Sequence, residues 1–128
     1  MNGSLIDTNV IIKFLNGNER AFDSLKNSEE IYVSVISVGE LFYGAFKSSR
    51  EKQNSEIIIG FLSEQKLLDI DEKTGQIYGD IKNKLVKKGI NIPENDIWIA
   101  AGAIANKLKL ITFDGHFSDI EELEVINP

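Results

Sequence analysis

The chain has 128 residues, no cysteine and a formal net charge of −6. This length suits one domain, and the lack of cysteine excludes a disulfide frame, a thiolate nucleophile and a thiolate metal site. The negative charge argues against a protein that coats DNA, but it does not exclude a metal-dependent nuclease, because bound cations reverse the charge locally. No apolar stretch approaches the ~20 residues that cross a bilayer and no signal-peptide pattern is present, so we expect no membrane contact and a cytoplasmic protein.

Short apolar runs alternate with segments of helical period along the whole chain, without a repeat, a low-complexity tract or a linker. The predicted strands are 5–6, 31–33, 67–68, 109–112 and 125–126, and the predicted helices are 7–16, 20–27, 37–47, 52–64, 72–88 and 96–107. Alternating strands and helices indicate a parallel sheet that is covered on both faces. We therefore expect an α/β fold, a three-layer α/β/α sandwich with a central, mainly parallel sheet, formed by residues 1–128 as a single domain.

Two carboxylates follow predicted strands directly. Asp7 stands after the first strand in "LIDTNVII", and Asp114 stands after the fourth in "LITFDGHF". Ligands of parallel sheets bind beyond the carboxyl ends of the strands. Both side chains are therefore expected at the same edge of the sheet.

Two further acids stand at the beginnings of predicted helices and can reach that edge. Glu40 lies in "SVGE" and Asp96 lies in "PEND". Ala100 and Ala103 share a helix face with Asp96, and their small side chains allow this helix to lie against the sheet. The sequence thus allows four carboxylates to converge.

Each acid also has a structural interpretation. Asp7 could cap the first helix, "SVGE" has the pattern of a capping box with Ser37 as N-cap and Glu40 reaching back, and Asn95 or Asp96 could cap the later helix. "TFDG" could be a plain turn. A cap needs only a short oxygen, which Ser or Thr also supplies, so four ionisable acids at converging junctions favour a site.

The quartet suits a hard divalent cation. Four converging carboxylates cannot all remain ionised without a cation between them, and Mg²⁺ or Mn²⁺ prefers carboxylate ligands. Such a site can neutralise a scissile phosphate and activate water, with one ion or two. His116 stands two residues beyond Asp114, and we interpret it as a surface residue outside the catalytic set.

Four stretches carry a resemblance to a known family: "LIDTNVII", "SVGELFYG", "IPENDIWIAAGA" and "LITFDGHF" resemble the conserved stretches of PIN-domain ribonucleases, above all VapC-type toxins of toxin–antitoxin pairs. The resemblance covers nearly the whole chain, although residues 47–89 match no motif. It implies an Mg²⁺- or Mn²⁺-dependent endoribonuclease toxin with RNA as substrate, a cognate antitoxin as partner, and a homodimer. The implied catalytic and metal-binding residues are Asp7, Glu40, Asp96 and Asp114, with supporting polar positions at Thr8, Asn9 and Thr112.

Other side chains are candidates for contacts with RNA. Phe42, Tyr43 and Phe46 could stack on bases, although core or interface packing is the ordinary interpretation. Two basic stretches could hold the RNA backbone, although a solvated helix face is the alternative. They comprise Lys82, Lys84, Lys87 and Lys88 in one stretch, and Lys47, Arg50 and Lys52 in the other.

Two expectations concern protein partners. Trp98 lies on the outer side of its predicted helix and is a candidate dimer contact, the alternative being packing under a loop of its own chain. Phe14, Leu15 and Phe22 could receive an apolar helix of the antitoxin, whose basic tail would reach the quartet, although core packing is again the alternative.

Two rival classes remain. A phospho-receiver domain needs adjacent acids after the first strand and a late lysine, and this sequence has neither in place. A PIN fold that only binds would not need the intact quartet.

Overall fold

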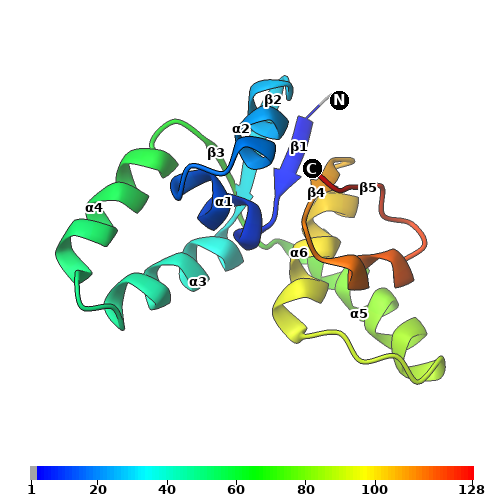
Figure 1. The fold of residues 1–128 in the computed structure, drawn as a ribbon. Helices are drawn as coiled ribbons and strands as arrows, with labels where there is room; N and C mark the ends of the chain where they lie inside the picture. The colour runs from blue at the N-terminus through cyan, green and yellow to red at the C-terminus, as the bar shows by residue number, and fades with distance from the viewer. Residues whose placement is uncertain (1–2) are drawn as a thin grey trace.

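The computed structural model describes residues 3–128, and these residues form a five-stranded sheet (Figure 1). Every neighbouring pair of strands is parallel, which confirms the predicted parallel sheet. The strand order is β3-β2-β1-β4-β5. The strands are β1 (Gly3–Ile6), β2 (Glu30–Ser34), β3 (Lys66–Leu68), β4 (Lys109–Ile111) and β5 (Val125–Ile126).

The helices follow the predicted order along the chain. They are α1 (Thr8–Leu15), α2 (Glu19–Lys26), α3 (Val35–Phe46), α4 (Glu51–Leu62), α5 (Glu72–Lys87), α6 (Glu94–Ala105) and the short 3-10 helix η1 (Gly115–Asp119). In Figure 1, α3 and α4 form an arm on one side of the sheet, and α5 and α6 lie on the other side. No helix in the described part of the chain has the length and apolar character of a membrane span.

Alternating strand side chains supply two separate cores, because successive residues of a strand point to opposite faces of the sheet. Leu5 and Leu110 pack with side chains of α5 and α6 in one cluster. Ile6 and Ile111 pack with side chains of α1, α2, α3 and α4 in the other. Helices therefore cover both faces, which confirms the three-layer α/β/α architecture.

The third helix begins earlier than the sequence pattern indicated. Ser34, the last residue of β2, is the N-cap of α3, and its hydroxyl accepts a hydrogen bond of 3.1 Å from the backbone N–H of Ile36. The predicted N-cap at Ser37 is therefore wrong. The helix starts directly from the extended end of the strand, and the first serine that reaches a free N–H takes the cap. This leaves Ser37 inside the helix, where it is buried.

The last long helix also begins earlier than predicted. Pro93 occupies the N-cap position of α6, and its carbonyl accepts hydrogen bonds from the N–H groups of Asp96 and Ile97. The predicted caps at Asn95 and Asp96 are therefore wrong. The carbonyl of Pro93 takes the first helical hydrogen bonds, so both polar side chains lie in the first turn.

The strand order reverses direction at the carboxyl ends of β1 and β4. From β1 the chain proceeds to β2 and β3 on one side, and β4 and β5 are added on the other side of β1. Such a reversal of strand order is where open parallel sheets bind ligands. In Figure 1 the arrow of β1 points into the space between α3 and α6.

Candidate active site

Asp7 stands directly after β1, at the carboxyl edge of the sheet. Its N–H bonds to the carbonyl of Ile111 at 2.9 Å, and only 4% of the residue is exposed. Its carboxylate accepts hydrogen bonds of 2.8 Å from the N–H of Thr8 and from the hydroxyl of Thr112. Asp7 is thus the N-cap of α1, as one interpretation expected, and its second oxygen is fixed by the end of β4.

Burial raises the pKa of Asp7 to about 6. The hydrogen bonds from Thr112 and Thr8 oppose this rise, and the negative charges of Asp96 and Glu40 add to it. A carboxyl group that loses hydration beside other carboxylates holds its proton more tightly. The side chain therefore stands in an electrostatic environment that favours a cation.

Thr112 and Asn9 tie the first helix to the fourth strand. The hydroxyl of Thr112 is fully buried and accepts from the N–H of Asp114 at 3.0 Å and from the amide of Asn9 at 3.4 Å. The amide oxygen of Asn9 in turn accepts from the N–H of Phe113 at 3.2 Å. The structure therefore brings these two supporting residues of the resemblance together with Asp7.

Glu40 projects from the middle of α3 and is held through both of its oxygens. Its Oε1 accepts a 2.6 Å hydrogen bond from the hydroxyl of Thr8, the first residue of α1. Its Oε2 accepts a 3.3 Å bond from the amide of Asn95 in α6. Glu40 does not reach back to cap its own helix; it joins the beginnings of α1 and α6.

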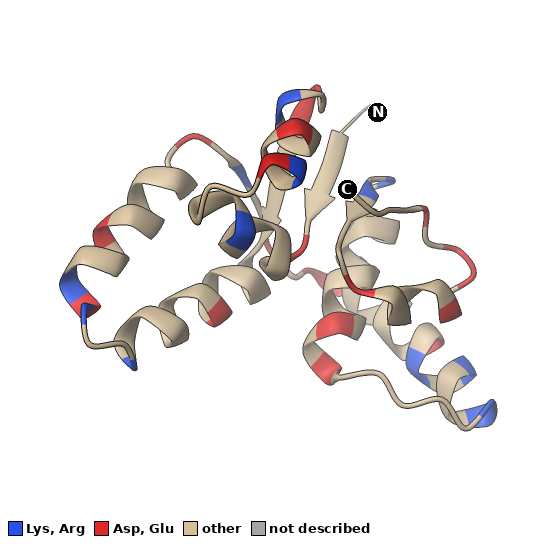
Figure 2. Cartoon of the chain, viewed as in Figure 1, with Lys and Arg blue, Asp and Glu red and all other residues tan. Residues whose placement is uncertain are grey.

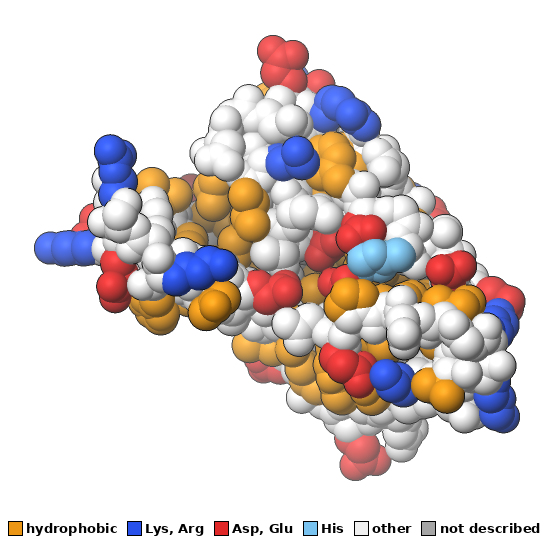
Figure 3. Space-filling model, turned by 60° about the horizontal axis from the view of Figure 1, so that its bottom comes forward, with side chains coloured by type: hydrophobic (Ala, Val, Ile, Leu, Met, Phe, Trp, Pro, Cys, Tyr) orange, Lys and Arg blue, Asp and Glu red, His pale blue; other side chains and the backbone are white. Residues whose placement is uncertain are grey.

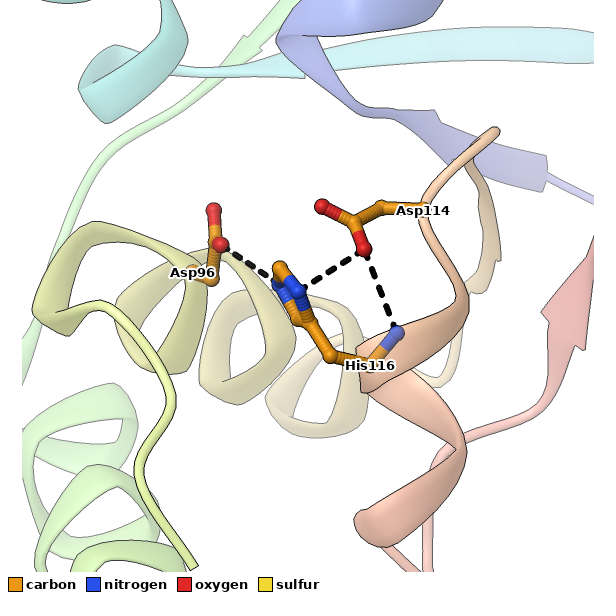
Figure 4. Close-up of side chains that lie close together, drawn as sticks. All are labelled: Asp96, Asp114 and His116. Atoms are coloured by element: carbon orange, nitrogen blue, oxygen red, sulfur yellow. Dashed lines mark hydrogen bonds and ion pairs between the residues drawn. The ribbon is translucent and has the colours of Figure 1, made fainter.

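Asp96 and Asp114 lie on either side of His116 (Figure 4). The imidazole Nε2 is 2.7 Å from Asp96 Oδ2, and Nδ1 is 2.7 Å from Asp114 Oδ1. Asp114 also caps η1, because its carboxylate accepts from the N–H of His116 at 3.2 Å. That turn folds the ring back over the two acids.

The interpretation of His116 as a surface residue is incomplete, because its side chain, 31% exposed, is half-buried and both ring nitrogens face carboxylates. The signal that sequence reasoning missed is the Asp-Gly-His spacing, in which a short capped turn places the third residue beside the first.

The four carboxylates form one electrostatic cluster. Burial raises the pKa of Asp96, the contact with His116 lowers it, and the charges of Glu40 and Asp114 raise it further. Glu40 and Asp96 act on the pKa of Asp7 in the same way. In Figure 3 the red acidic side chains gather around the pale blue histidine on one face of the molecule.

Within this cluster, three residues offer a donor set for a cation. One ligand atom each of Asp96, Asp114 and His116 lies within 4.8 Å of the others. Carboxylate oxygens suit Mg²⁺ and Mn²⁺, and an imidazole nitrogen is compatible with Mn²⁺ and other transition metals. The residues present thus fit a divalent cation.

Of the two basic stretches that were candidates for RNA contacts, the first pairs with acids of the same chain. Lys82 contacts Glu94 at 3.1 Å, and Lys84 contacts Glu122 at 2.6 Å. The first stretch lies on α5, and the second lies at the tip of the arm formed by α3 and α4 (Figure 2). The alternative, a solvated helix face, describes the first stretch better.

Two cations that sequence reasoning did not single out lie beside the ring of Phe113. The ammonium of Lys13 is 5.2 Å from the ring centroid of Phe113, and the guanidinium of Arg20 is 5.5 Å from it. Phe113 is the neighbour of Asp114. Both cations are isolated in the sequence, so no local charge pattern marks them.

Trp98 packs within its own chain. Its ring stacks on Tyr78 of α5 with centroids 4.0 Å apart and an interplanar angle of 9°. The alternative interpretation of Trp98 therefore describes its surroundings, although the partner is a helix and not a loop. An exposed apolar face lies instead on α3, at Val35, Tyr43 and Phe46.

Comparison with known proteins places this arrangement in a family. The PIN domain family model matches residues 4–123. The chain therefore belongs to the PIN domain family, and its parallel sheet is consistent with that class.

Within that family, the similar proteins include VapC ribonucleases. Ribonuclease VapC2 of Haemophilus influenzae is 38% identical over 112 residues, which cover 84% of this chain and 83% of the relative. The tRNA(fMet)-specific endonuclease VapC of Salmonella typhimurium is 31% identical over 110 residues, with the same two shares of 84% and 83%. A chain in the structure of VapBC2 from Rickettsia felis bound to a promoter DNA fragment superimposes with a TM-score of 0.91 at 31% identity, covering 98% of both chains.

Proposed function

We propose that this protein is the toxin of a toxin–antitoxin pair, an Mg²⁺- or Mn²⁺-dependent endoribonuclease of the cytoplasm. The observation that supports the proposal most is that Thr8 joins the carboxylates of Asp7 and Glu40. The carboxylates of Asp96 and Asp114 likewise share His116. Its relatives are named as ribonucleases, which supports RNA as the substrate.

The chain's own residues hold and orient the reacting groups. Asp96 and Asp114, with His116 between them, provide the ligand atoms that lie closest together. Asp7 and Glu40 add negative charge from the neighbouring elements, and hydrogen bonds from Thr112 and Thr8 fix their oxygens. When bound, the cation supplies positive charge for the scissile phosphate and activates water for attack.

The test of this function is cleavage of RNA by the purified chain. Structured RNA, with tRNA among the substrates, is incubated with Mn²⁺ and, in parallel, with an excess of EDTA. We expect cleavage with Mn²⁺ and none with EDTA. Intact RNA in both reactions would contradict the nuclease, and equal cleavage in both would contradict the metal requirement alone.

A groove beside the quartet supports an antitoxin as the partner. The groove has a volume of about 280 Å³, and α1, α3 and α4 supply its apolar walls. Glu40 lines the groove together with Ile12, Leu15, Leu41, Ile57 and Ile58. An amphipathic helix in this groove would carry a basic neighbouring segment directly to the acids, where Arg bonds carboxylates best.

Of the three side chains expected to receive that helix, only Leu15 lines this groove. Phe14 packs against Phe61 of α4, with ring centroids 5.6 Å apart, and lies near Phe22 at 6.4 Å. Core packing therefore accounts for Phe14, and the proposed contact moves toward the arm formed by α3 and α4.

Ile57→Asp should weaken binding of the cognate antitoxin at least about tenfold, because a charge in the groove opposes burial of an apolar helix. Ile59→Asp is the matched control, since Ile59 lies on the same helix and is exposed outside the groove lining. Titration calorimetry of both variants measures the difference. Equal weakening by both variants would place the partner elsewhere.

We also propose that two copies of the chain associate through the exposed face of α3. Val35, Tyr43 and Phe46 are spaced by eight and three residues, which places them on one side of a helix. Tyr43→Lys should then shift the protein toward the monomer in sedimentation velocity. A wild type that is monomeric at micromolar concentration would refute the dimer.

A further inference from the structure

The hydroxyl of Ser37 is fully buried, although its helix does not need it. The residue has 0% exposure, and Ser34 already caps α3. The Ser37 hydroxyl contacts Oγ1 of Thr8 at 2.8 Å, and Thr8 stands 29 positions earlier in the chain. A buried hydroxyl aimed at a neighbouring helix requires a reason, because burying a polar group costs free energy unless it is bonded.

The number of hydroxyl hydrogens decides which group is the donor in this contact. The Thr8 hydroxyl lies 2.8 Å from the Ser37 hydroxyl and 2.6 Å from Glu40 Oε1, but it carries only one hydrogen. Hydroxyl bonds to a carboxylate are short and strong, typically about 2.5–2.7 Å. Thr8 therefore donates to Glu40, and Ser37 donates to Thr8.

These two hydrogen bonds join α1 to α3. Ser37 and Glu40 are three residues apart and so share one side of α3, while Thr8 begins α1. The backbone N–H of Thr8 donates to Asp7 at 2.8 Å. One residue thus orients two members of the acidic quartet, and Ser37 fixes the side-chain rotamer of that residue.

We infer that Ser37 is a positioning residue of the metal site, acting through Thr8 on the carboxylate of Glu40. This inference rests on the proposed metal-dependent function. Without the Ser37 hydroxyl, the Thr8 hydroxyl is free to turn away from Glu40, and the carboxylate loses its fixed direction. Groups that orient metal ligands typically change metal affinity about 10–100-fold when they are removed.

The measurement is Mn²⁺ binding by the full chain in titration calorimetry, without RNA. Ser37→Ala should bind Mn²⁺ about tenfold more weakly than the wild type. Ser37→Thr, which keeps the hydroxyl, should restore most of the affinity. Ser34→Ala is the matched control: it removes a serine hydroxyl from the same helix, and it should lower the melting temperature while leaving Mn²⁺ affinity within about twofold, because a cap contributes to stability alone.

A double-mutant cycle tests whether Ser37 acts through Thr8. Thr8→Val removes the intermediate hydroxyl at nearly constant shape, so adding Ser37→Ala to it should weaken Mn²⁺ binding no further. This comparison also applies if Ser37→Ala alone loses stability, because all variants are measured at a temperature where circular dichroism shows them folded.

Two outcomes would overturn the inference. Ser37→Ala that binds Mn²⁺ as the wild type does would remove Ser37 from the metal site and leave the proposed function intact. Additive losses in the double variant would show that Ser37 does not act through Thr8. A wild type without measurable Mn²⁺ binding would overturn both this inference and the proposed metal-dependent function.

Discussion

Asp96→Asn is expected to reduce metal-dependent RNA cleavage at least about 100-fold, since losing a ligand should exceed the 10–100-fold effect of losing a group that orients one. The amide keeps the shape of the carboxylate but not its charge, and Mg²⁺ or Mn²⁺ needs that charge. Asp96 caps no helix, and its partner in the structure is His116. Cleavage rates of the two purified proteins under saturating Mn²⁺ measure the effect.

The fold should tolerate this change. A carboxylate in the first turn stabilises a helix by about 0.3–1 kcal/mol, so its loss lowers stability slightly. Removing one charge from the quartet also relieves repulsion between the carboxylates, which offsets this loss. We therefore expect the melting temperature of metal-free Asp96→Asn to remain near that of the wild type. A large decrease would mean that Asp96 is structural, and full cleavage would exclude it as a ligand.

Asp71→Asn provides the matched control. Asp71 is the N-cap of α5, where its carboxylate accepts from the N–H of Thr74 at 2.9 Å. Asparagine caps helices about as well as aspartate, so this variant should keep both stability and cleavage. Loss of cleavage in Asp71→Asn as well would show that the assay responds to any loss of negative charge.

Periodicity predicted the order and type of the strands and long helices, because alternating strand residues and helical stripes encode burial directly. It misplaced helix starts. Ser37 matched a capping box better than Ser34, and Asp96 matched an N-cap better than Pro93. A cap depends on which group reaches a free N–H in space. Local sequence patterns do not show the direction in which the preceding strand or loop enters the helix.

The candidate site, like the helices, was predictable from the sequence only in part. Strand-end positions place Asp7 and Asp114 from the sequence alone, because the ends of parallel strands must meet at one edge. His116 could not be placed, since its role depends on the short turn that follows Asp114. The ion pair of Lys84 with Glu122 was invisible for another reason: its members are 38 positions apart and meet only in the folded chain.

Asp7→Asn is expected to stabilise the metal-free protein, while it removes charge from the metal site. The folded protein raises the pKa of Asp7 from 3.8 to about 6. A difference of about two pKa units corresponds to up to about 3 kcal/mol at neutral pH. The amide of asparagine avoids this cost but cannot accept the Thr112 hydroxyl in the same way, so we expect a gain of about 1–3 kcal/mol in the free energy of unfolding.

The pH dependence of the unfolding free energy tests independently whether ionised Asp7 stabilises or destabilises the folded protein. Between pH 4 and 6 the folded protein binds more protons at Asp7 than the unfolded chain does, so the contribution of Asp7 to stability falls as the pH rises through this range. Below pH 4 both states are protonated and the cost vanishes. Asp7→Asn lacks this step, so the difference in unfolding free energy between the two metal-free proteins should be small at pH 4 and should grow toward pH 7.

Mn²⁺ should stabilise the wild type more than Asp7→Asn. A cation that binds the folded state alone raises its stability by mass action, and the ionised Asp7 is the form that attracts it. Thermal melts at pH 7 should therefore show a larger Mn²⁺-induced increase in melting temperature for the wild type than for Asp7→Asn. An Asp7→Asn protein that is less stable than the wild type without metal, at both pH 4 and pH 7, would mean that the cap on α1 and the bond to Thr112 outweigh the cost of the buried charge.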